Sequence, residues 1–246
     1  MTVERDTAHA AYVLHSHPYR ETSLLVDVFT RGRGRLTLVA RGARRPRSVL
    51  RGQLMSFQPL ALSWFGKGEV RTLSRAEWVG GQPLLAGRAL LCGFYLNELL
   101  QRLLPRDDAH EALFEAYTVA LAGLSRVQDE APVLRRFERA LLKELGYALT
   151  LEHEIGSGQP IVSGKTYTYE PERGPVPVAV AGRNSSGPRN DTPLLDGQAL
   201  LDIARDDFSN PMTLVQAKSL MRALINHRLE YRPLQSRRIF QELQDL

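Results

Sequence analysis

The spacing of apolar residues changes once along the chain, close to residue 80. Before that point the apolar residues form short runs rich in strand formers, and glycines separate several of these runs. Short runs of this kind, bounded by glycine, predict β-strands. We expect strands within 10–14, 23–29, 35–41, 54–64 and 69–78. Five short strands in succession predict a small barrel.

After Gly80-Gly81-Gln82-Pro83 the apolar residues recur every three to four positions, which predicts amphipathic helices. The expected helices cover 84–104, 109–124, 132–145, 194–208, 211–229 and 233–246. The segment between the third and fourth helices is rich in glycine and proline, and only 167–169 and 176–180 resemble strands. We therefore predict an α+β chain. A five-stranded barrel over 1–80 precedes an α-helical domain made of 81–152 and 193–246, with a loop-rich insert over 153–192.

Composition indicates a globular chain without a bound metal or other cofactor. The chain has 246 residues, of which 43% are hydrophobic and 24% are charged. No apolar run approaches the roughly 18 residues of a membrane span, and the charged N-terminus does not resemble a signal peptide. We therefore expect a cytoplasmic protein. The single Cys92 cannot form an internal disulfide or a thiolate zinc site, and the six histidines do not form a ligand set.

Positive charge is concentrated in the first third of the chain. Residues 1–80 hold thirteen basic and six acidic residues, and no acidic residue lies between Asp27 and Glu69. A surface of this kind attracts a polyanion, because each neutralised phosphate releases a condensed counterion. The alternative is a solvated basic face without a partner. The expected DNA-contacting residues are the eight arginines within this stretch: Arg31, Arg33, Arg35, Arg41, Arg44, Arg45, Arg47 and Arg51.

Aromatic residues near these arginines are candidates for stacking on bases. A barrel of this size is most often an OB-fold, which commonly binds single-stranded nucleic acid; this step is an analogy between folds. We expect Phe29 and Phe57 to lie in the barrel core, whereas Tyr19 and Trp64 remain open candidates.

One segment superficially resembles a nucleotide-binding loop. Gly158 and Gly164-Lys165-Thr166 are separated by five residues, whereas a phosphate-binding loop needs four, and no strand precedes the segment. The residues 167–169 also do not begin a helix, so a bound phosphate would lack the N–H groups of a helix N-terminus. We interpret the segment as a glycine turn before a strand, and we expect no enzymatic activity.

A second basic group lies on the third predicted helix, around an apolar stripe. A basic rim beside an apolar groove suits an acidic peptide with an apolar end, whereas the alternative is ordinary amphipathic packing with long side chains covering the stripe. The residues concerned are Leu134, Arg135, Arg136, Arg139 and Lys143.

Several motifs, in order along the chain, resemble the RecO family of bacterial DNA repair proteins. The N-terminal signature is His15-Ser16-His17-Pro18-Tyr19-Arg20-Glu21-Thr22-Ser23-Leu24-Leu25, followed by Val39-Ala40-Arg41-Gly42-Ala43-Arg44. Later motifs are Tyr95-Leu96-Asn97-Glu98-Leu99-Leu100, Leu134-Arg135-Arg136-Phe137-Glu138 and Arg232-Pro233-Leu234-Gln235-Ser236-Arg237.

This resemblance implies an N-terminal OB-fold, an α-helical body and a recombination mediator that is not an enzyme. Such proteins bind single- and double-stranded DNA, anneal complementary strands without ATP, and act with RecR. They contact the acidic C-terminal tail of the single-stranded DNA-binding protein SSB and help load RecA, which makes the third-helix group a candidate tail site. The alternative is chiefly an adaptor between SSB and RecR. Several members carry a four-cysteine zinc module in the insert; residues 151–158 here contain no cysteine, so other contacts must hold this insert.

Overall fold

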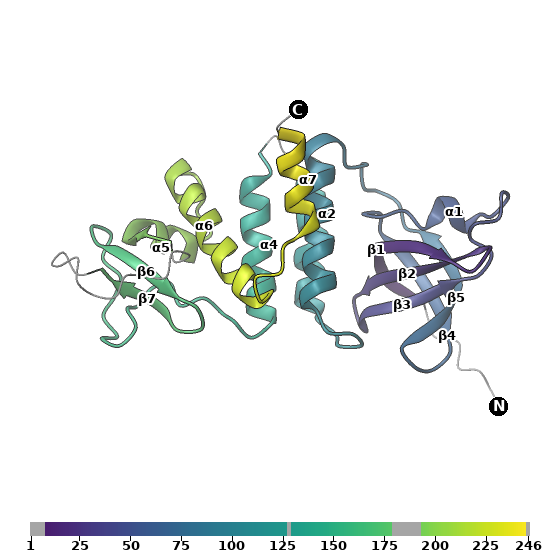
Figure 1. The fold of residues 1–246 in the computed structure, drawn as a ribbon, viewed down its shortest axis with the longest axis horizontal. Helices are drawn as coiled ribbons and strands as arrows, with labels where there is room; N and C mark the ends of the chain where they lie inside the picture. The colour runs from purple at the N-terminus through teal and green to yellow at the C-terminus, as the bar shows by residue number, and fades with distance from the viewer. Residues whose placement is uncertain (1–7, 127–128, 179–192, 245–246) are drawn as a thin grey trace. The chain divides into compact units, whose positions relative to one another are not determined.

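The computed structural model describes residues 8–126, 129–178 and 193–244. The chain divides into two compact units (Figure 1). The first comprises Met1–Gln128 and Leu234–Leu246, and the second comprises Asp129–Pro233.

The first unit begins with a closed five-stranded barrel, shown at the right of Figure 1. Neighbouring strands are antiparallel except for the parallel pair β3–β5, and a short helix separates β3 from β4. The predicted N-terminal barrel is therefore confirmed. Its elements are β1 (His9–Tyr19), β2 (Ser23–Thr30), β3 (Gly34–Ala40), α1 (Leu50–Gln53), β4 (Leu60–Phe65) and β5 (Val70–Trp78).

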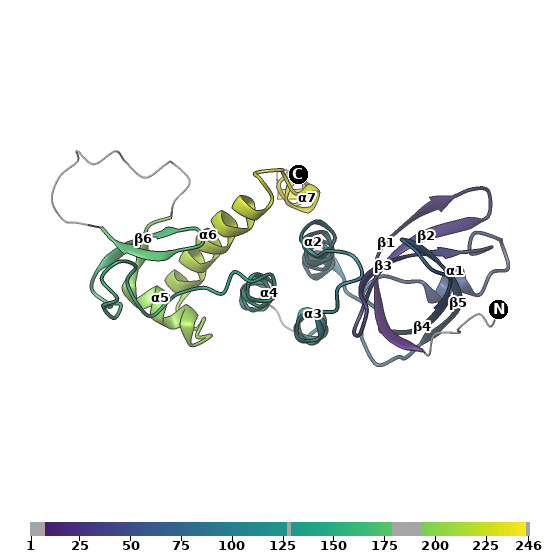
Figure 2. The same cartoon turned by 90° about the horizontal axis from the view of Figure 1, so that it is seen from below.

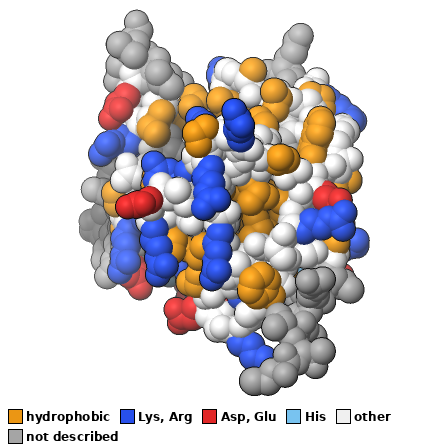
Figure 3. Space-filling view, turned by 90° about the vertical axis from the view of Figure 1, so that its right-hand side faces the viewer, with side chains coloured by type: hydrophobic (Ala, Val, Ile, Leu, Met, Phe, Trp, Pro, Cys, Tyr) orange, Lys and Arg blue, Asp and Glu red, His pale blue; other side chains and the backbone are white. Residues whose placement is uncertain are grey.

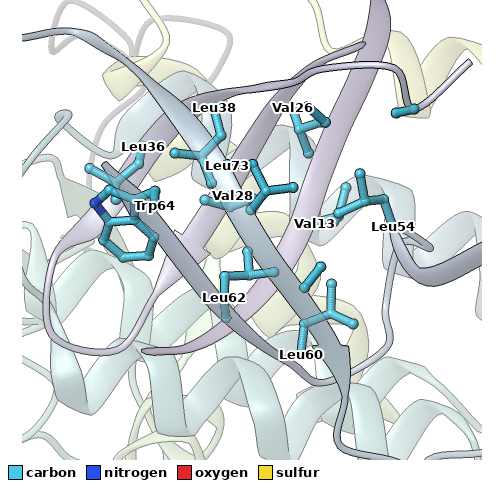
Figure 4. Packing of buried hydrophobic residues seen from close by; sticks show 14 residues of the cluster. Val13, Val26, Val28, Leu36, Leu38, Leu54, Leu60, Leu62, Trp64 and Leu73 are labelled. Carbon is cyan, nitrogen blue, oxygen red and sulfur yellow. The ribbon is translucent and has the colours of Figure 1, made fainter. Parts of the chain in front are cut away.

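Alternating apolar residues of the strands fill the barrel interior (Figure 4). Val13, Val28, Leu38 and Leu62 are completely buried, and Trp64 is almost so. Side chains on alternate strand positions point to one face, which explains this inward set. Phe29 and Phe57 are buried as well, but outside this interior cluster, because Phe29 packs against the Phe114 ring and Phe57 against the Phe94 ring. The prediction that they lie in the barrel core is therefore wrong. The candidate Trp64 is thus a core residue, where its ring stacks on that of His9 at 4.7 Å.

The fourth strand begins later than its apolar run suggested. Strand structure was expected from Leu54, but β4 begins at Leu60. Pro59 lies immediately before the strand and has no N–H group to donate to a neighbouring strand, so the ladder does not extend through it. Leu54 instead contributes to the barrel core after α1, and Phe57 adopts a left-handed backbone conformation with φ of 66°.

Three helices complete the first unit: α2 (Gly87–Leu103), α3 (Glu111–Leu124) and α7 (Gln235–Gln244). A buried polar group joins β1 to two of them. The Asn97 side chain of α2 donates to the Leu14 carbonyl at 2.8 Å, and the Tyr117 hydroxyl of α3 donates to Asn97 at 2.5 Å. The β1–β2 register shifts between Val13 and His15, so Asn97 satisfies a carbonyl at the irregular point of the strand.

The C-terminal helix α7 begins against a carboxylate of α2. Glu98 accepts hydrogen bonds from the backbone N–H groups of Gln235 and Ser236, both at 2.9 Å, and from the Ser236 hydroxyl at 2.7 Å. These N–H groups have no partner within their own helix, so Glu98 acts as a cap from another element. The family motif that contains Glu98 and the one that contains Ser236 lie far apart in the sequence and therefore meet at this cap.

The described residues of the second unit form three helices and a small sheet. The sheet has the order β7-β6-β8, and β8 contacts α5 and α6. Figure 2 shows β6 beside these two helices. The β6–β7 hairpin lies in the predicted loop-rich insert, of which residues 179–192 are outside the described residues. The elements are α4 (Ala131–Glu144), β6 (Thr166–Glu170), β7 (Gly174–Pro177), β8 (Leu195–Asp196), α5 (Gly197–Ala204) and α6 (Pro211–Arg228).

A buried carboxylate ties the start of the insert to its hairpin. Glu154 accepts hydrogen bonds from the Ser157 hydroxyl at 2.8 Å, the Tyr167 hydroxyl at 3.2 Å and the Lys165 ammonium at 3.4 Å. The hydrogen bond from Ser157, together with Lys165 and Tyr167, lowers the pKa of Glu154 below its ordinary value, although burial alone would raise that pKa. The carboxylate therefore stays charged and joins three parts of an insert that has no cysteine ligands.

Candidate nucleic-acid interface

The structure separates the eight candidate arginines into two groups. Thr30 pairs with Gly34 at one end of the β2–β3 hairpin, and Leu24 pairs with Ala40 at the other. Arg31, Arg33 and Arg35 lie at the first end, and the arginines after Ala40 lie beyond the second. A seven-residue strand spans roughly 20 Å. The two groups are therefore at opposite ends of β3 and do not form one surface.

Within the first group, two arginines are engaged by other parts of the first unit. Arg31 forms ion pairs with Glu115 at 3.1 Å and Glu111 at 3.9 Å, both on α3. Arg35 is partly buried and donates to the Leu104 carbonyl at 3.1 Å. Burial and the nearby Arg106 lower the pKa of Arg35 from its ordinary value. Arg33 is exposed in the turn, so the three side chains do not share one environment.

The second group forms an exposed cationic surface. Arg41, Arg44, Arg45, Arg47 and Arg51 are all exposed, and none of them forms an ion pair with a described acidic residue. Figure 3 shows the barrel side of the molecule, where several Lys and Arg side chains gather with few acidic ones. Their positive charge is therefore available to an anionic ligand.

Hydrogen bonds hold this cationic loop against the β1–β2 turn. The Arg44 guanidinium donates to the carbonyls of Arg20 and Glu21 at 3.3 and 3.2 Å, and its backbone N–H donates to Thr22 at 2.9 Å. Arg44 therefore shapes the loop, while Arg41 and Arg45 face a shallow hollow next to it.

The hollow lies on the outer face of the barrel where β1, β2, β3 and β5 run side by side. Tyr19 pairs with Ser23, and Val39 pairs with Leu25 on one side and Thr72 on the other. The volume is about 440 Å³, and the lining is Tyr19, Arg20, Thr22, Ser23, Val39, Arg41, Gly42, Arg45 and Thr72.

One aromatic ring and several guanidinium groups thus share this hollow. The Arg20 guanidinium lies 5.2 Å from the centre of the half-buried Tyr19 ring. Guanidinium groups can bind phosphate through two N–H groups, and a tyrosine ring offers a stacking face to an unpaired base. Sequence reasoning did not select Arg20; its position beside Tyr19, between two predicted strands, was the available signal. The arrangement can hold the backbone of a nucleic acid and one base.

The candidate residues on α4 have unequal roles. Arg135 is buried in an ion pair with Glu138 at 2.8 Å, and Leu134 is half-buried. Arg139 donates to the carbonyl of Ile203 at the end of α5 and pairs with Asp206 at 3.1 Å. These contacts match the amphipathic-packing alternative for both arginines.

Two α4 cations remain exposed, on the same side of the helix. Arg136 and Lys143 are seven residues apart, which is about two helical turns. The Arg136 guanidinium lies 5.4 Å from the centre of the Phe208 ring and donates to the Asp206 carbonyl at 3.3 Å. Arg136 and Lys143 are therefore the members of this group that an acidic peptide could contact.

The remaining motifs have simpler structural explanations. Lys165 pairs with Glu154, and the glycine turn leads into the strand β6, as the sequence predicted. Within the described ranges, no three His, Cys, Asp or Glu side chains are grouped as metal ligands. None of the described helices has the length and apolar character needed to cross a bilayer.

The fold and this surface define a class: an OB-fold barrel with an exposed cationic face, followed by a largely helical region. Two family models match the chain, "Recombination protein O N terminal" over residues 4–82 and "Recombination protein O C terminal" over residues 85–238. The chain therefore belongs to the RecO family.

Similar proteins carry the name "DNA repair protein RecO". The relative from Aromatoleum aromaticum is 56% identical over 243 residues, which cover 99% of this chain and 98% of the relative. Relatives from Azoarcus sp. and Nitrosospira multiformis are 55% and 54% identical over the same shares of both chains. Similarity thus extends through both compact units.

Proposed function

We propose that this chain is a recombination mediator of DNA repair. It binds single- and double-stranded DNA in the cytoplasm, at the nucleoid, and anneals complementary strands without ATP. With RecR it helps load RecA onto single-stranded DNA coated by SSB. The observation that carries this proposal is the exposed arginine surface after β3, beside the hollow that contains Tyr19. Membership of a family of DNA repair proteins supports it.

The proposed annealing mechanism is electrostatic. Two single strands repel each other through their phosphates, and a cationic surface lowers that repulsion by neutralising part of each backbone. Base pairing then supplies the free energy of annealing, so no nucleotide hydrolysis is needed. The planar guanidinium of an arginine can bind a phosphate through two N–H groups, and such a contact with the backbone leaves the base edges free to pair.

A salt titration of DNA affinity tests this mechanism. If six arginines contact single-strand phosphates, the logarithm of the DNA association constant falls against the logarithm of the salt concentration with a slope of about −4. The six are Arg20, Arg41, Arg44, Arg45, Arg47 and Arg51. Replacing both Arg41 and Arg45 by alanine removes about 1.4 from that slope and weakens binding to all sequences. Fluorescence anisotropy with a labelled oligonucleotide measures both quantities. A slope near zero in the wild-type protein contradicts the proposal.

The two-group arrangement supplies a matched control. Arg33 is also exposed, but it lies at the opposite end of β3. We expect Arg33→Ala to change the slope and the affinity much less than Arg41→Ala. If Arg33→Ala and Arg41→Ala weaken DNA binding equally, DNA also contacts the β2–β3 turn, where Arg31 and Arg35 were predicted to bind it.

The second candidate function is the adaptor role, which the exposed pair Arg136 and Lys143 favours. Replacing both by alanine should impair annealing of SSB-coated strands and leave annealing of bare strands unchanged. Lys218→Ala with Arg222→Ala is the control, because both are exposed cations of the same unit. If the α4 variant anneals bare and coated strands as well as the wild type does, this surface does not bind the SSB tail.

A further inference from the structure

Two histidines lie side by side on β1. The centres of the His15 and His17 rings are 5.9 Å apart, and the ring planes make an angle of 34°. Both residues are exposed, and neither imidazole forms a hydrogen bond or an ion pair with another described residue. Their ring nitrogens are therefore available to a ligand.

A bulge in β1 directs both side chains outward. Ala11 and Val13 point into the barrel, so strict alternation along the strand would direct His15 and His17 inward as well. The register of the β1–β2 pair shifts between Val13 and His15, which reverses the alternation. Bulges re-aim side chains in this way and are frequent next to functional sites.

The pairing with β2 places the two histidines on the outer face of the barrel. His15 lies opposite Asp27, and Asp27 stands between the core residues Val26 and Val28 (Figure 4). Because Val26 and Val28 point inward, Asp27 and His15 point outward. His17 follows two residues later on the same face.

The backbone that carries the pair is restrained on both sides. Asn97 donates to the carbonyl of Leu14, immediately before His15, at 2.8 Å. Pro18 follows His17 directly, and its ring fixes its own φ. A ligand that binds both imidazoles therefore has less chain entropy to remove than it would on a flexible loop.

The chemistry and spacing of the pair suit a transition-metal cation. Imidazole nitrogens are favoured ligands of Zn²⁺, Ni²⁺ and Cu²⁺. A zinc–nitrogen bond is about 2.0–2.1 Å long, so two imidazole rings that share one ion have centres roughly 5–6.5 Å apart. The separation of 5.9 Å between His15 and His17 lies within this interval.

Asp27 makes the position more suitable for a cation than for a phosphate. Directly opposed residues of an antiparallel pair have Cβ atoms about 4.5–5.5 Å apart, so the Asp27 carboxylate lies next to the His15 imidazole. The Thr37 hydroxyl donates to this carboxylate at 2.5 Å and restrains it. A carboxylate beside a histidine ligand orients the ring and strengthens metal binding.

We propose that His15 and His17 bind a divalent transition-metal ion, and that Asp27 is the positioning residue for His15. No third ligand is grouped with the pair among the described residues, so water or another oxygen ligand fills the remaining coordination positions. The ion is exchangeable, and the barrel folds without it. The site lies in the first unit, whereas the four-cysteine module of some family members belongs to the insert.

Isothermal titration calorimetry of EDTA-treated, dialysed protein with zinc chloride tests the site. We expect one saturable Zn²⁺ site per chain and no binding of Mg²⁺, which prefers oxygen ligands. His15→Asn with His17→Asn should abolish the site, and Asp27→Asn should weaken it about tenfold. His153→Asn is the matched control, because His153 is an exposed histidine of the second unit.

NMR of the imidazole ¹⁵N nuclei locates the ion in the wild-type protein, so the test does not depend on the folding of a variant. Zinc should shift the assigned His15 and His17 resonances and leave that of His153 in place. The shifts should reverse when EDTA is added, because the ion is exchangeable.

Three outcomes would overturn the inference. They are the absence of saturable Zn²⁺ binding, equal Zn²⁺ affinity in the wild type and the double variant, and His15 and His17 resonances that Zn²⁺ leaves unchanged. The proposed function fails separately, because DNA binding and annealing of bare strands are measured on the EDTA-treated wild-type protein without added zinc.

Discussion

At the scale of single residues, a polar residue of one family motif, Asn97, is buried and hydrogen-bonded on both sides of its amide. Asn97 lies on an otherwise apolar helix face and supplies both a donor and an acceptor to its neighbours. Burial raises the pKa of Tyr117 well above its ordinary value, so the hydroxyl remains a donor to Asn97. This pair connects the irregular point of β1 to two helices.

Replacing Asn97 by leucine should lower the free energy of unfolding by about 2–6 kcal/mol. Leucine has a similar volume, but it leaves the Leu14 carbonyl and the Tyr117 hydroxyl without their partner, at about 1–3 kcal/mol each. Urea unfolding followed by circular dichroism measures the loss. Tyr117→Phe should cost less, since it keeps the bond to Leu14; equal stability of Asn97→Leu and the wild type would contradict this account.

At the scale of elements, α7 depends on a cap from α2. Burial alone would raise the pKa of Glu98, but the hydrogen bonds from Ser236 and Gln235, together with Arg102, hold that pKa below its ordinary value. Because the folded-state pKa is the lower one, Glu98 contributes stability above the ordinary glutamate pKa. That contribution disappears as the pH falls through the folded-state pKa.

The start of α7 should therefore loosen on acidification. Glu98→Gln should lower stability by about 1–2 kcal/mol near neutral pH, because an amide is a weaker cap than a carboxylate. Hydrogen exchange of the Gln235 and Ser236 amides reports this locally. The wild type should approach the variant at acidic pH; amides that exchange equally in both proteins at neutral pH would show that Glu98 is not the cap.

At the scale of the whole molecule, the first unit is built from both ends of the chain. Residues 129–233 form the second unit, after which α7 returns to pack on α2. Arg237 of α7 donates to the Tyr95 hydroxyl of α2 at 3.4 Å. The domain boundaries expected near residues 80, 152 and 193 remain predictions.

Deleting residues 234–246 should destabilise the first unit selectively. The deletion uncovers the face of α2 that α7 contacts and removes the partners of Glu98. Hydrogen exchange should increase throughout α2 and the barrel, whereas α4 and α6 should keep their protection. Loss of protection in both units to the same extent would show that they unfold as one cooperative block.

The sequence by itself determined the five-stranded N-terminal barrel, the helical region after it and the concentration of positive charge in the first third of the chain, but not the short helix α1 or the strand β8. These features depend on short-range periodicity and composition, which the chain displays directly. It also predicted that Phe29 and Phe57 are buried, though not that they pack outside the barrel, and it predicted strand-like residues in the insert where the β6–β7 hairpin lies.

Only the tertiary structure decided which charges are available. Arg31 and Arg41 look alike in the sequence, yet Arg31 meets Glu115, an acid 84 residues away, while Arg41 faces the hollow. Arg135 is likewise buried in an ion pair with Glu138, whereas its neighbour Arg136 is exposed. Charge pattern reports how many cations a segment holds, but long-range packing decides which of them meet a carboxylate and which meet solvent.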